Sequence, residues 1–244
     1  MRPADTSGPC WAAYESGDYL GTVAVELDDE DPVWRVLSTH ESFESVDDAV
    51  RALRRPSSWP RERREASRWA RALLADERLT VVDVETTGLD QAWAVQIAAV
   101  DRDGVVIFSE YVDPCADIEP GAIAVHGITP EWVAGAPVFG ELVEDLAAGL
   151  HGRTLVAYNA AFDAGVFERE LTRHFGAADA AGEWMAQCRW HDAMFPYAVW
   201  RGLWSLKHGT YRAQRLGGSH DAVADCRMLL RKLELMARTV PAPR

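Results

Sequence analysis

The sequence predicts an α/β domain preceded by a small α+β unit. From residue 79 onward, segments rich in β-forming residues alternate with helical segments, which is the pattern of a sheet flanked by helices. The first 76 residues instead hold β-rich segments followed by helical ones. A chain of 244 residues can bury one good core and a small second one. We therefore expect an N-terminal unit at 1–76 and a second domain at 77–240.

The N-terminal unit is expected to contain a β-hairpin and two helices. Segments 19–27 and 33–39 are rich in β-formers, and the run DDEDP between them is a polar turn. A helix is then expected over 46–55, because Ser45 can cap it and Asp48 occupies the partner position of a capping box. The stretch PSSWP ends that helix, and a second helix follows at about 61–75.

The second domain is expected to alternate strands and helices. Its strands are predicted at 79–85, 94–101, 105–112, 154–158 and 184–190. Its helices are predicted at 139–150, 161–175, 192–200 and 221–238. Residues 202–218 form the least regular segment, and a loop of that length inside a compact domain is often functional.

Composition narrows the class of protein. The net charge of −13 argues against a coat protein that binds DNA tightly and non-specifically, because phosphate contacts need a basic surface. The longest apolar runs are too short for a membrane span, and the first residues lack the apolar stretch of a secretory signal. The four cysteines are scattered, which favours reduced thiols over a zinc site. We expect a cytoplasmic protein without membrane association.

The stretch VVDVETTG at 81–88 holds the most informative pair of acidic residues. The apolar run predicts a strand buried on both faces. Asp83 and Glu85 are two residues apart, so their carboxylates project from the same face near the strand end. Two buried carboxylates this close repel each other and resist desolvation, and divalent cations would remove both penalties. The alternative is a solvated strand end at which the acids bind nothing.

Two further motifs follow. YNAAFD at 158–163 places Asp163 in the first turn of a helix, where an acid alone would be explained by the helix dipole. SHDAVAD at 219–225 places His220 on a loop, with Ser219 or His220 near the N-cap and Asp225 inside the helix. Five residues cover about 500° of helix, so two helical side chains at this spacing would diverge. A fixed acid beside a mobile imidazole suits a metal ligand and a general base.

The order of these motifs, DxETG-like, NxxFD and HxxxxD, resembles the DEDDh exonucleases, the DnaQ-like superfamily that includes polymerase proofreading subunits and ribonuclease T. The resemblance covers about 79–237, and VHGIT at 125–129 also looks like a common stretch of that family. It implies a ribonuclease H-like fold with a mixed five-stranded sheet flanked by helices. The superfamily's other branch would carry tyrosine in place of His220.

The resemblance implies a 3′→5′ exonuclease that releases nucleoside 5′-monophosphates from DNA, at single strands or 3′ ends, by two-metal-ion hydrolysis. The family's four metal-binding acids fall on Asp83, Glu85, Asp163 and Asp225, and its catalytic histidine on His220. Hard carboxylate oxygens suit two Mg²⁺ or Mn²⁺ ions, with Asp83 as the bridging ligand. An imidazole with an ordinary pKa of about 6.5 can take a proton from the attacking water.

Substrate contacts are expected at two places near these motifs. Thr86, Thr87 and Gly88 follow the metal-binding strand, and their backbone N–H groups could meet the 3′-terminal nucleotide. Leu89 would wedge against the terminal base, as the family's equivalent residue does. In the second motif, Asn159 and Phe162 are also candidates, although Phe162 could equally belong to the core.

A third group of candidates lies in the irregular segment. It interleaves basic and aromatic side chains, namely Lys207, His208, Tyr211, Arg212 and Arg215. Such a loop could follow the phosphates of a single strand and stack on its bases. The alternative is a solvated basic loop.

Two other functions remain open at this stage. An exoribonuclease that trims RNA 3′ ends would use the same metals, so the catalytic residues do not separate RNA from DNA. A non-catalytic nucleic-acid-binding module of the same fold would lack at least one of the five catalytic residues, and all five are present. Residues 1–76 match no motif, and they are a candidate surface for a protein partner.

Overall fold

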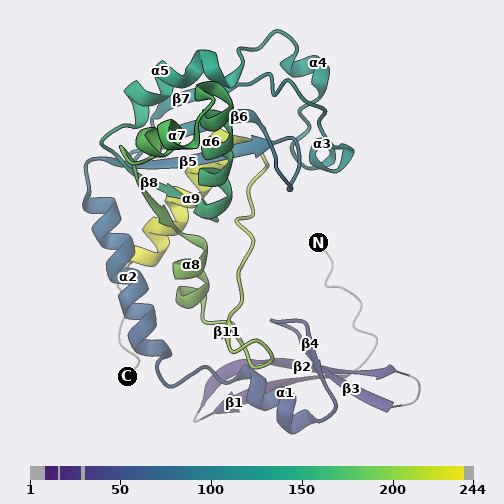
Figure 1. Ribbon diagram of the computed structural model, residues 1–244. Coiled ribbons are helices and arrows are strands. Elements are labelled where there is room, and N and C mark those ends of the chain that lie inside the picture. Colours follow the sequence, from purple (N-terminus) through teal and green to yellow (C-terminus); the bar gives the residue numbers. More distant parts are fainter. Residues whose placement is uncertain (1–8, 16, 29–30, 239–244) are drawn as a thin grey trace. The chain divides into compact units, whose positions relative to one another are not determined.

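The computed structural model describes residues 9–15, 17–28 and 31–238 (Figure 1). The chain divides into two compact units. The larger unit is formed by Ser67–Pro196 and Arg215–Arg244, and the smaller unit by Met1–Ala66 and Tyr197–Gln214. Each unit is thus built from two separate stretches of the chain, because most of the irregular segment at 202–218 belongs with the N-terminal residues. The functional domains expected at 1–76 and 77–240 stay a prediction.

The larger unit is built on a mixed five-stranded sheet, as the sequence predicts. Its strands are β5 (Leu79–Thr86), β6 (Ala94–Asp101), β7 (Val106–Tyr111), β8 (Thr154–Ala157) and β9 (Arg189–Asp192), in the order β7-β6-β5-β8-β9. β5, β6 and β7 are antiparallel neighbours, whereas β8 pairs parallel with both β5 and β9. β5 is therefore the central strand, at the point where the sheet changes from antiparallel to parallel pairing.

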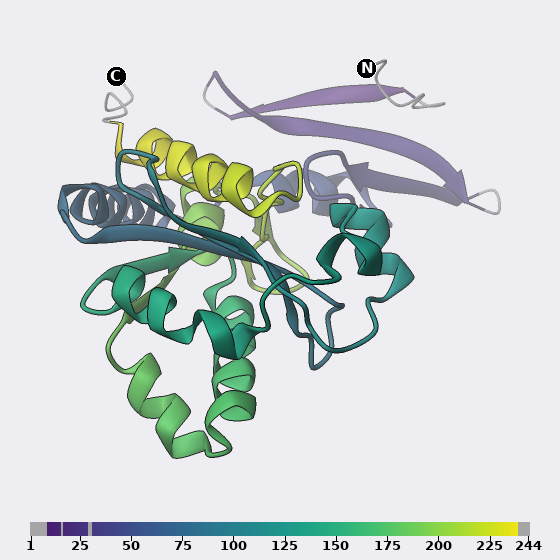
Figure 2. The ribbon, with the colours of Figure 1, turned by 90° about the horizontal axis from the view of Figure 1, so that it is seen from above.

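Helices cover both faces of this sheet. The helices that follow β5 along the chain are α3 (Pro120–His126), α4 (Pro130–Val133), α5 (Phe139–Leu150), α6 (Ala160–Phe175), α7 (Ala178–Met185), α8 (Met194–Arg201) and α9 (Ala222–Ala237). Of these, α5, α6 and α9 pack on the sheet, and α8 belongs to the smaller unit from Tyr197 onward. Figure 2 shows α9, in yellow, on one face of the sheet, with α5 and α6 on the other. In the described part of the chain, no helix combines the length and the apolar character needed to cross a membrane.

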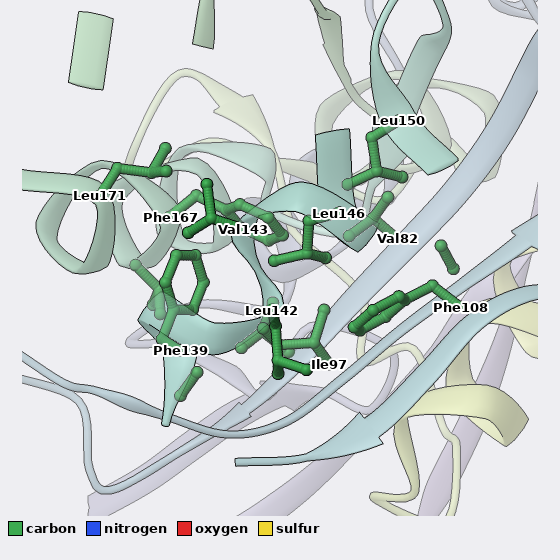
Figure 3. Packing of buried hydrophobic residues seen from close by; sticks show 14 of the residues in the cluster. Val82, Ile97, Phe108, Phe139, Leu142, Val143, Leu146, Leu150, Phe167 and Leu171 are labelled. Carbon is green, nitrogen blue, oxygen red and sulfur yellow. The ribbon is translucent and has the colours of Figure 1, made fainter. Parts of the chain in front are cut away.

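The core of the larger unit lies between the sheet and the helices α5 and α6 (Figure 3). Val82 and Ile97 from the sheet meet Leu146 from α5 and Phe167 from α6, and these four side chains are almost completely buried. The ring of Phe139 stands edge-on to that of Phe167, with 5.9 Å between the ring centroids. This packing holds the two helices in place against β5.

The strand expected over 184–190 is wrong in its first half. Trp184 belongs to α7, where its ring stacks on Phe167 with 6.1 Å between centroids, and β9 begins only at Arg189. Tertiary packing of an aromatic residue therefore outweighs its β propensity. The helix expected from residue 192 begins at Met194, because the carboxylate of Asp192 accepts a hydrogen bond from the N–H of Phe195 at 3.0 Å.

The smaller unit contains an antiparallel sheet of four strands. In order they are β1 (Cys10–Glu15), β2 (Asp18–Asp28), β3 (Asp31–Val36) and β4 (Glu41–Phe43). The pairing of β2 with β3 confirms the predicted hairpin, and residues 29 and 30 of its expected turn lie outside the described residues. A two-stranded ribbon, β10 (Trp204–Ser205) and β11 (Thr210–Tyr211), comes from the segment that the sequence left irregular.

Two helices follow the sheet of the smaller unit along the chain. α1 (Val46–Leu53) begins as predicted, because Ser45 accepts a hydrogen bond from the N–H of Asp48 at 3.2 Å and donates one to its carboxylate at 2.8 Å. Ala49 and Leu53 of α1 are buried against this sheet. α2 (Trp59–Ala75) contributes its first half to the smaller unit and its second half to the larger one.

Candidate active site

Two carboxylates lie near the C-terminal end of β5. Val82 and Val84 point into the core beneath α5 and α6, so Asp83 and Glu85, at alternate positions, project to the face covered by α9. β8 pairs with β5 only as far as Val81. Beyond that residue, the backbone of β5 has a strand neighbour only on the β6 side, which leaves room for a side chain from another element.

Asp163 of α6 fills this place. Its carboxylate accepts a hydrogen bond from the backbone N–H of Val84, and the side chain is buried. The start of α6 is held by Asp192, whose Oδ1 accepts from the N–H groups of Asn159 and Ala160 at 3.1 Å each. Asn159 has a φ of 75°, a left-handed conformation that asparagine tolerates better than most residues. This turn directs Asp163 toward the end of β5.

The first turn of α9 brings in the fourth carboxylate, that of Asp225. Asp221 is the N-cap and accepts from the N–H of Ala224 at 2.9 Å. Gln96 of β6 joins this cap to the sheet, because its side chain accepts from the N–H of Ala222 at 3.1 Å and donates to Asp221 at 3.4 Å. Asp225 is thereby buried at a fixed place beside β5 and β6.

His220 lies on the loop immediately before α9, as the motif spacing predicts. The helix cap is Asp221, which corrects the expected cap at Ser219 or His220 by two residues or one. His220 is exposed and has a φ of 57°, a left-handed conformation that is uncommon outside glycine but that histidine adopts more often than most residues. Metal-ligand atoms of Glu85, His220 and Asp225 lie within 4.8 Å of one another.

The carboxylates raise one another's pKa. Burial raises the pKa of Asp83 well above its ordinary value, and the negative charges of Asp163, Glu85 and Asp225 add to this effect. Burial, with the charge of Asp225, raises the pKa of Glu85 to about 7. Burial raises the pKa of Asp163 to about 8. Without a cation, several of these acids therefore retain protons at neutral pH.

These residues fit a divalent cation. The Oδ1 atom of Asp225 is buried, and it has no hydrogen-bond partner among the described residues, although buried polar atoms are usually paired. The donor set consists of carboxylate oxygens and one imidazole, which suits hard cations such as Mg²⁺ and Mn²⁺. A bound cation would satisfy the buried oxygen and remove the mutual repulsion of the acids.

A comparison with protein families decides what this arrangement belongs to. The model of the RNase_T family, described as an exonuclease, matches residues 80–233, a range that contains all five residues discussed above. The chain belongs to this family of DEDDh, DnaQ-like exonucleases.

Individual relatives agree with this assignment. The exonuclease is 31% identical over 185 residues to the uncharacterized exonuclease CP81 of Escherichia phage 186. The aligned region covers 70% of this chain and 94% of the phage protein. The exonuclease is 34% identical over 107 residues to the DNA polymerase III subunit epsilon of Pasteurella multocida (strain Pm70), covering 39% of this chain and 42% of that subunit. The match thus spans less than half of the epsilon subunit.

The fold is also found among solved structures. A zinc-bound complex of E. coli ExoI with single-stranded DNA has a TM-score of 0.51 and 20% sequence identity, covering 64% of this chain and 39% of that one. At this identity the likeness shows the fold. It confirms the ribonuclease H-like α/β architecture expected for the exonuclease.

The raised pKa values predict how pH affects the stability of the metal-free exonuclease. The pKa of Asp163 is about 8 in the folded protein, above the unfolded value of about 3.9. Stability gained from the proton is therefore present at low pH and is lost as pH rises from about 4 to 8. In EDTA, we expect Asp163→Asn to raise the free energy of unfolding at pH 8 by at least about 1 kcal/mol, or about 2–4 °C in Tm.

The control for this experiment is Asp145→Asn, which removes the same charge from an exposed position on α5. Thermal unfolding in EDTA at pH 5 and pH 8 measures the effect. Equal gains for the two variants at pH 8, or a gain at pH 5 as large as that at pH 8, would contradict the electrostatic explanation.

The loop between β5 and β6 contains the first group of expected substrate contacts. Thr86 donates its hydroxyl to the carbonyl of Gly88 at 2.7 Å, and the hydroxyl of Thr87 accepts from the N–H of Trp93 at 3.0 Å. The N–H of Thr87 is already bonded to the carbonyl of Trp93 at 2.9 Å, so it is not available to a nucleotide. Leu89 is 83% exposed, as a residue that contacts substrate must be. The substrate roles of these residues stay predictions.

A buried ion pair on α6 holds the far end of this loop. Glu170 is completely buried and accepts from the N–H of Ala94, the first residue of β6, at 3.1 Å. Its second oxygen pairs with Arg173 at 2.5 Å. The guanidinium of Arg173 also lies 4.0 Å from the centre of the Trp93 ring. The helix that carries Asp163 therefore also fixes the loop that carries Leu89.

We expect Glu170→Gln to lower the free energy of unfolding by about 1–3 kcal/mol, since glutamine keeps the contact with Ala94 but loses the charge that pairs with Arg173. Glu168→Gln, an exposed residue on the same helix, is the matched control. Urea unfolding of both variants provides the measurement. A loss no greater than that of the control would show that the pair does not stabilise the fold.

The remaining expected contacts are distributed over both units. Asn159 and Arg215 are exposed in the larger unit, and their roles stay predictions. Phe162 is partly buried and packs against the core, which favours the structural explanation for this residue. The structure thus brings the five catalytic candidates into one unit, whereas four of the substrate candidates belong to the other unit.

Those four are Lys207, His208, Tyr211 and Arg212 of the smaller unit. Tyr211 is buried, donates its hydroxyl to Glu62, and has its ring 5.0 Å from that of Trp204. Its ring is therefore not presented for stacking on a base, which corrects the sequence interpretation for this residue.

Three residues that hold parts of the site in place were not identified from the sequence. Asp192 and Gln96 hold the helix starts described above, and their partners are too distant along the chain for a motif to reveal them. His126 lies in the VHGIT stretch, which was the available signal. Its Nδ1 accepts from the N–H of Ile128 at 3.0 Å, so Nε2 carries the proton and donates to the carbonyl of Thr86 at 3.1 Å. Burial lowers the pKa of His126, which favours this neutral form.

Proposed function

We propose that this exonuclease releases nucleoside 5′-monophosphates from the 3′ ends of DNA, in single strands or at frayed ends, with the help of two divalent cations. The observation that carries the proposal is the convergence of β5, α6 and α9, which brings four carboxylates and one histidine to the C-terminal end of a central strand. The relationship to DNA polymerase III epsilon subunits favours DNA as the substrate. Attack at the 3′ end is what the resemblance to the DEDDh exonucleases implies.

Asp83, Glu85, Asp163 and Asp225 would hold the cations. When bound, two Mg²⁺ or Mn²⁺ ions neutralise the charge that develops on the phosphate and activate the attacking water. The four acids are positioned by elements that cannot move independently, because Asp163 is bonded to the backbone of β5 and the cap of α9 is bonded to Gln96 of β6. Carboxylates held in fixed positions can in turn hold a substrate phosphate in the geometry that the reaction requires.

His220 would act as the general base. It is exposed on a loop beside Asp225 and Glu85, so its imidazole can reach the water that attacks the phosphate and accept its proton. Leu89 would separate the terminal base from its neighbour, since its side chain stands almost fully exposed on a loop anchored at both ends. We also expect the enzyme to act in the cytoplasm.

The proposal is tested with strands labelled at either the 5′ or the 3′ end. Single-stranded DNA, double-stranded DNA and RNA are digested with Mg²⁺, with Mn²⁺ or with EDTA. We expect metal-dependent release of mononucleotides from the 3′ end, with DNA as the better substrate. Release from the 5′ end would contradict the polarity, and faster digestion of RNA would favour the exoribonuclease instead.

A further inference from the structure

The smaller unit contains a cavity of about 630 Å³, and part of its lining comes from the basic residues of the irregular segment. One wall is formed by β4 and the residue before it, and the other by the turn between β10 and β11. Its lining includes a carboxylate, an aromatic ring and several nitrogen-bearing side chains, namely His40, Glu41, Phe43, Lys207, His208 and Arg212. All of these residues belong to the same compact unit.

Glu41 organises this cavity. The residue is only 8% exposed, and its Oε1 accepts from the hydroxyl of Ser205 and lies 3.4 Å from the guanidinium of Arg212. The hydroxyl of Ser205 in turn accepts from the N–H of His208 at 3.2 Å. One buried carboxylate therefore fixes both the arginine and the turn that carries Lys207.

The cavity has an excess of positive charge. Arg212 is balanced by Glu41, whereas Lys207 is exposed and makes no ion pair with any residue in the described part of the chain. Such a local excess is notable in a chain with a net charge of −13. The ligand should therefore carry an anionic group that can approach the ammonium of Lys207.

The ligand should also offer a hydrogen-bond donor. The Oε2 atom of Glu41 is buried, and it has no partner among the described residues. A phosphate alone could satisfy Lys207 but has no N–H group for this carboxylate. A nucleotide has both, because its phosphate is anionic and its base carries amino or imino groups that carboxylates accept from. The exposed imidazoles of His40 and His208 supply flat surfaces for the base.

We propose that this cavity binds one nucleotide of a single-stranded nucleic acid, as a contact with the substrate that is additional to the catalytic site. The inference rests on the proposed function for the identity of the strand. A strand held at two places dissociates more slowly than one held at its end alone, so the cavity would lower the KM for long strands. Substrates of one nucleotide would gain nothing from it.

The test compares Lys207→Glu with Arg64→Glu, a control that reverses the same charge at an exposed position on α2 of the same unit. Fluorescence anisotropy in EDTA measures binding of a labelled DNA strand of about 20 nucleotides without hydrolysis. We expect Lys207→Glu to raise Kd at least about fivefold. The slope of log K against log salt should also become less negative by about 0.7, the value of one phosphate contact with a single strand. The control should change neither quantity.

An unchanged Kd in Lys207→Glu, or an equal rise in the control, overturns the proposal. Stronger binding of polyglutamate than of DNA, lost in Lys207→Glu, also overturns it and assigns the cavity to an acidic protein. Hydrolysis of the p-nitrophenyl ester of thymidine 5′-monophosphate separates the two proposals, because this small substrate requires only the catalytic site. Lack of ester hydrolysis by the wild type and by both variants would contradict the proposed function. The binding measurement would still show whether the cavity binds a nucleotide.

Discussion

Replacement of Asp83 by asparagine is expected to lower kcat by at least about 10³-fold. Removal of a group that stabilises charge in the transition state lowers kcat by a factor of this order. Asparagine keeps the size of the side chain but removes the charge that would bridge two cations. The same substitution relieves the repulsion from Asp163, Glu85 and Asp225, so the metal-free protein should become more stable. Loss of activity with a gain in stability distinguishes a functional acid from a structural one.

The measurement is hydrolysis of a 3′-labelled single strand in Mg²⁺ and in Mn²⁺, together with thermal unfolding in EDTA. Asp145→Asn serves as the control, because it removes one charge from an exposed position in the same unit. Activity of the Asp83→Asn protein within tenfold of the wild type would exclude a central role for this acid. A lower Tm would show that Asp83 mainly supports the fold.

The second large effect is expected from Gly218→Ala. A methyl group at this position would overlap the carboxylate of Asp225, with its Oδ1 as the nearest atom. Asp225 is buried, and the backbone N–H groups of Ser219 and His220 face its carboxylate, so the side chain cannot turn away without losing them. We expect kcat/KM to fall by about 10²-fold, since misplacement of about 1 Å is enough to do so.

Gly182→Ala is the control for this substitution, because a methyl group there meets nothing within 4 Å apart from its chain neighbours and the nearby backbone of α7. Titration with Mn²⁺ and hydrolysis of a labelled strand measure the two consequences, weaker metal binding and slower turnover. Unchanged metal affinity in Gly218→Ala, or an equal loss in the control, would show that the loop can move aside.

Most of the larger unit could be predicted from the sequence because its strands and its longer helices have clear boundaries, whereas the short helices α3, α4 and α7 were not predicted. The helix α5 was predicted with the correct bounds, and β6 likewise. The pattern of β5 was decisive, since an apolar run with acids at alternate positions defines both a buried strand and a functional face. The 184–190 segment failed because Trp184 is placed by its contact with Phe167, which is 17 positions away in the chain.

The smaller unit was harder to predict. β1 is mostly exposed and so lacks the alternation that reveals a half-buried strand, and β4 is three residues long. Residues 197–214 also belong to this unit, and they are joined to its N-terminal part by contacts between residues far apart in the sequence. One example is the hydrogen bond of the Trp59 indole N–H to the carbonyl of Val199 at 2.8 Å. Gly202 lies against the same indole, which leaves no room for a side chain there. Contacts between residues about 140 positions apart leave no local pattern in the sequence.

The candidate site shows a similar division. Asp83 and Glu85 follow from strand geometry, while Asp163, His220 and Asp225 needed the order of three motifs. The residues that hold them could not be predicted, because Asp192 and Gln96 are ordinary polar residues whose role depends on what the fold places beside them. A sequence thus reveals side chains that carry chemistry more readily than those that position them.

The most direct test of the central claim is a crystal structure of the protein soaked in Mn²⁺, with anomalous scattering used to locate the metal. We predict manganese within coordinating distance of carboxylate oxygens of Asp83 and Asp225, with the second ion, where present, sharing Asp83. In the Asp83→Asn protein these peaks should be lost. Manganese bound away from both acids, or peaks that persist unchanged in Asp83→Asn, would contradict the proposed metal site.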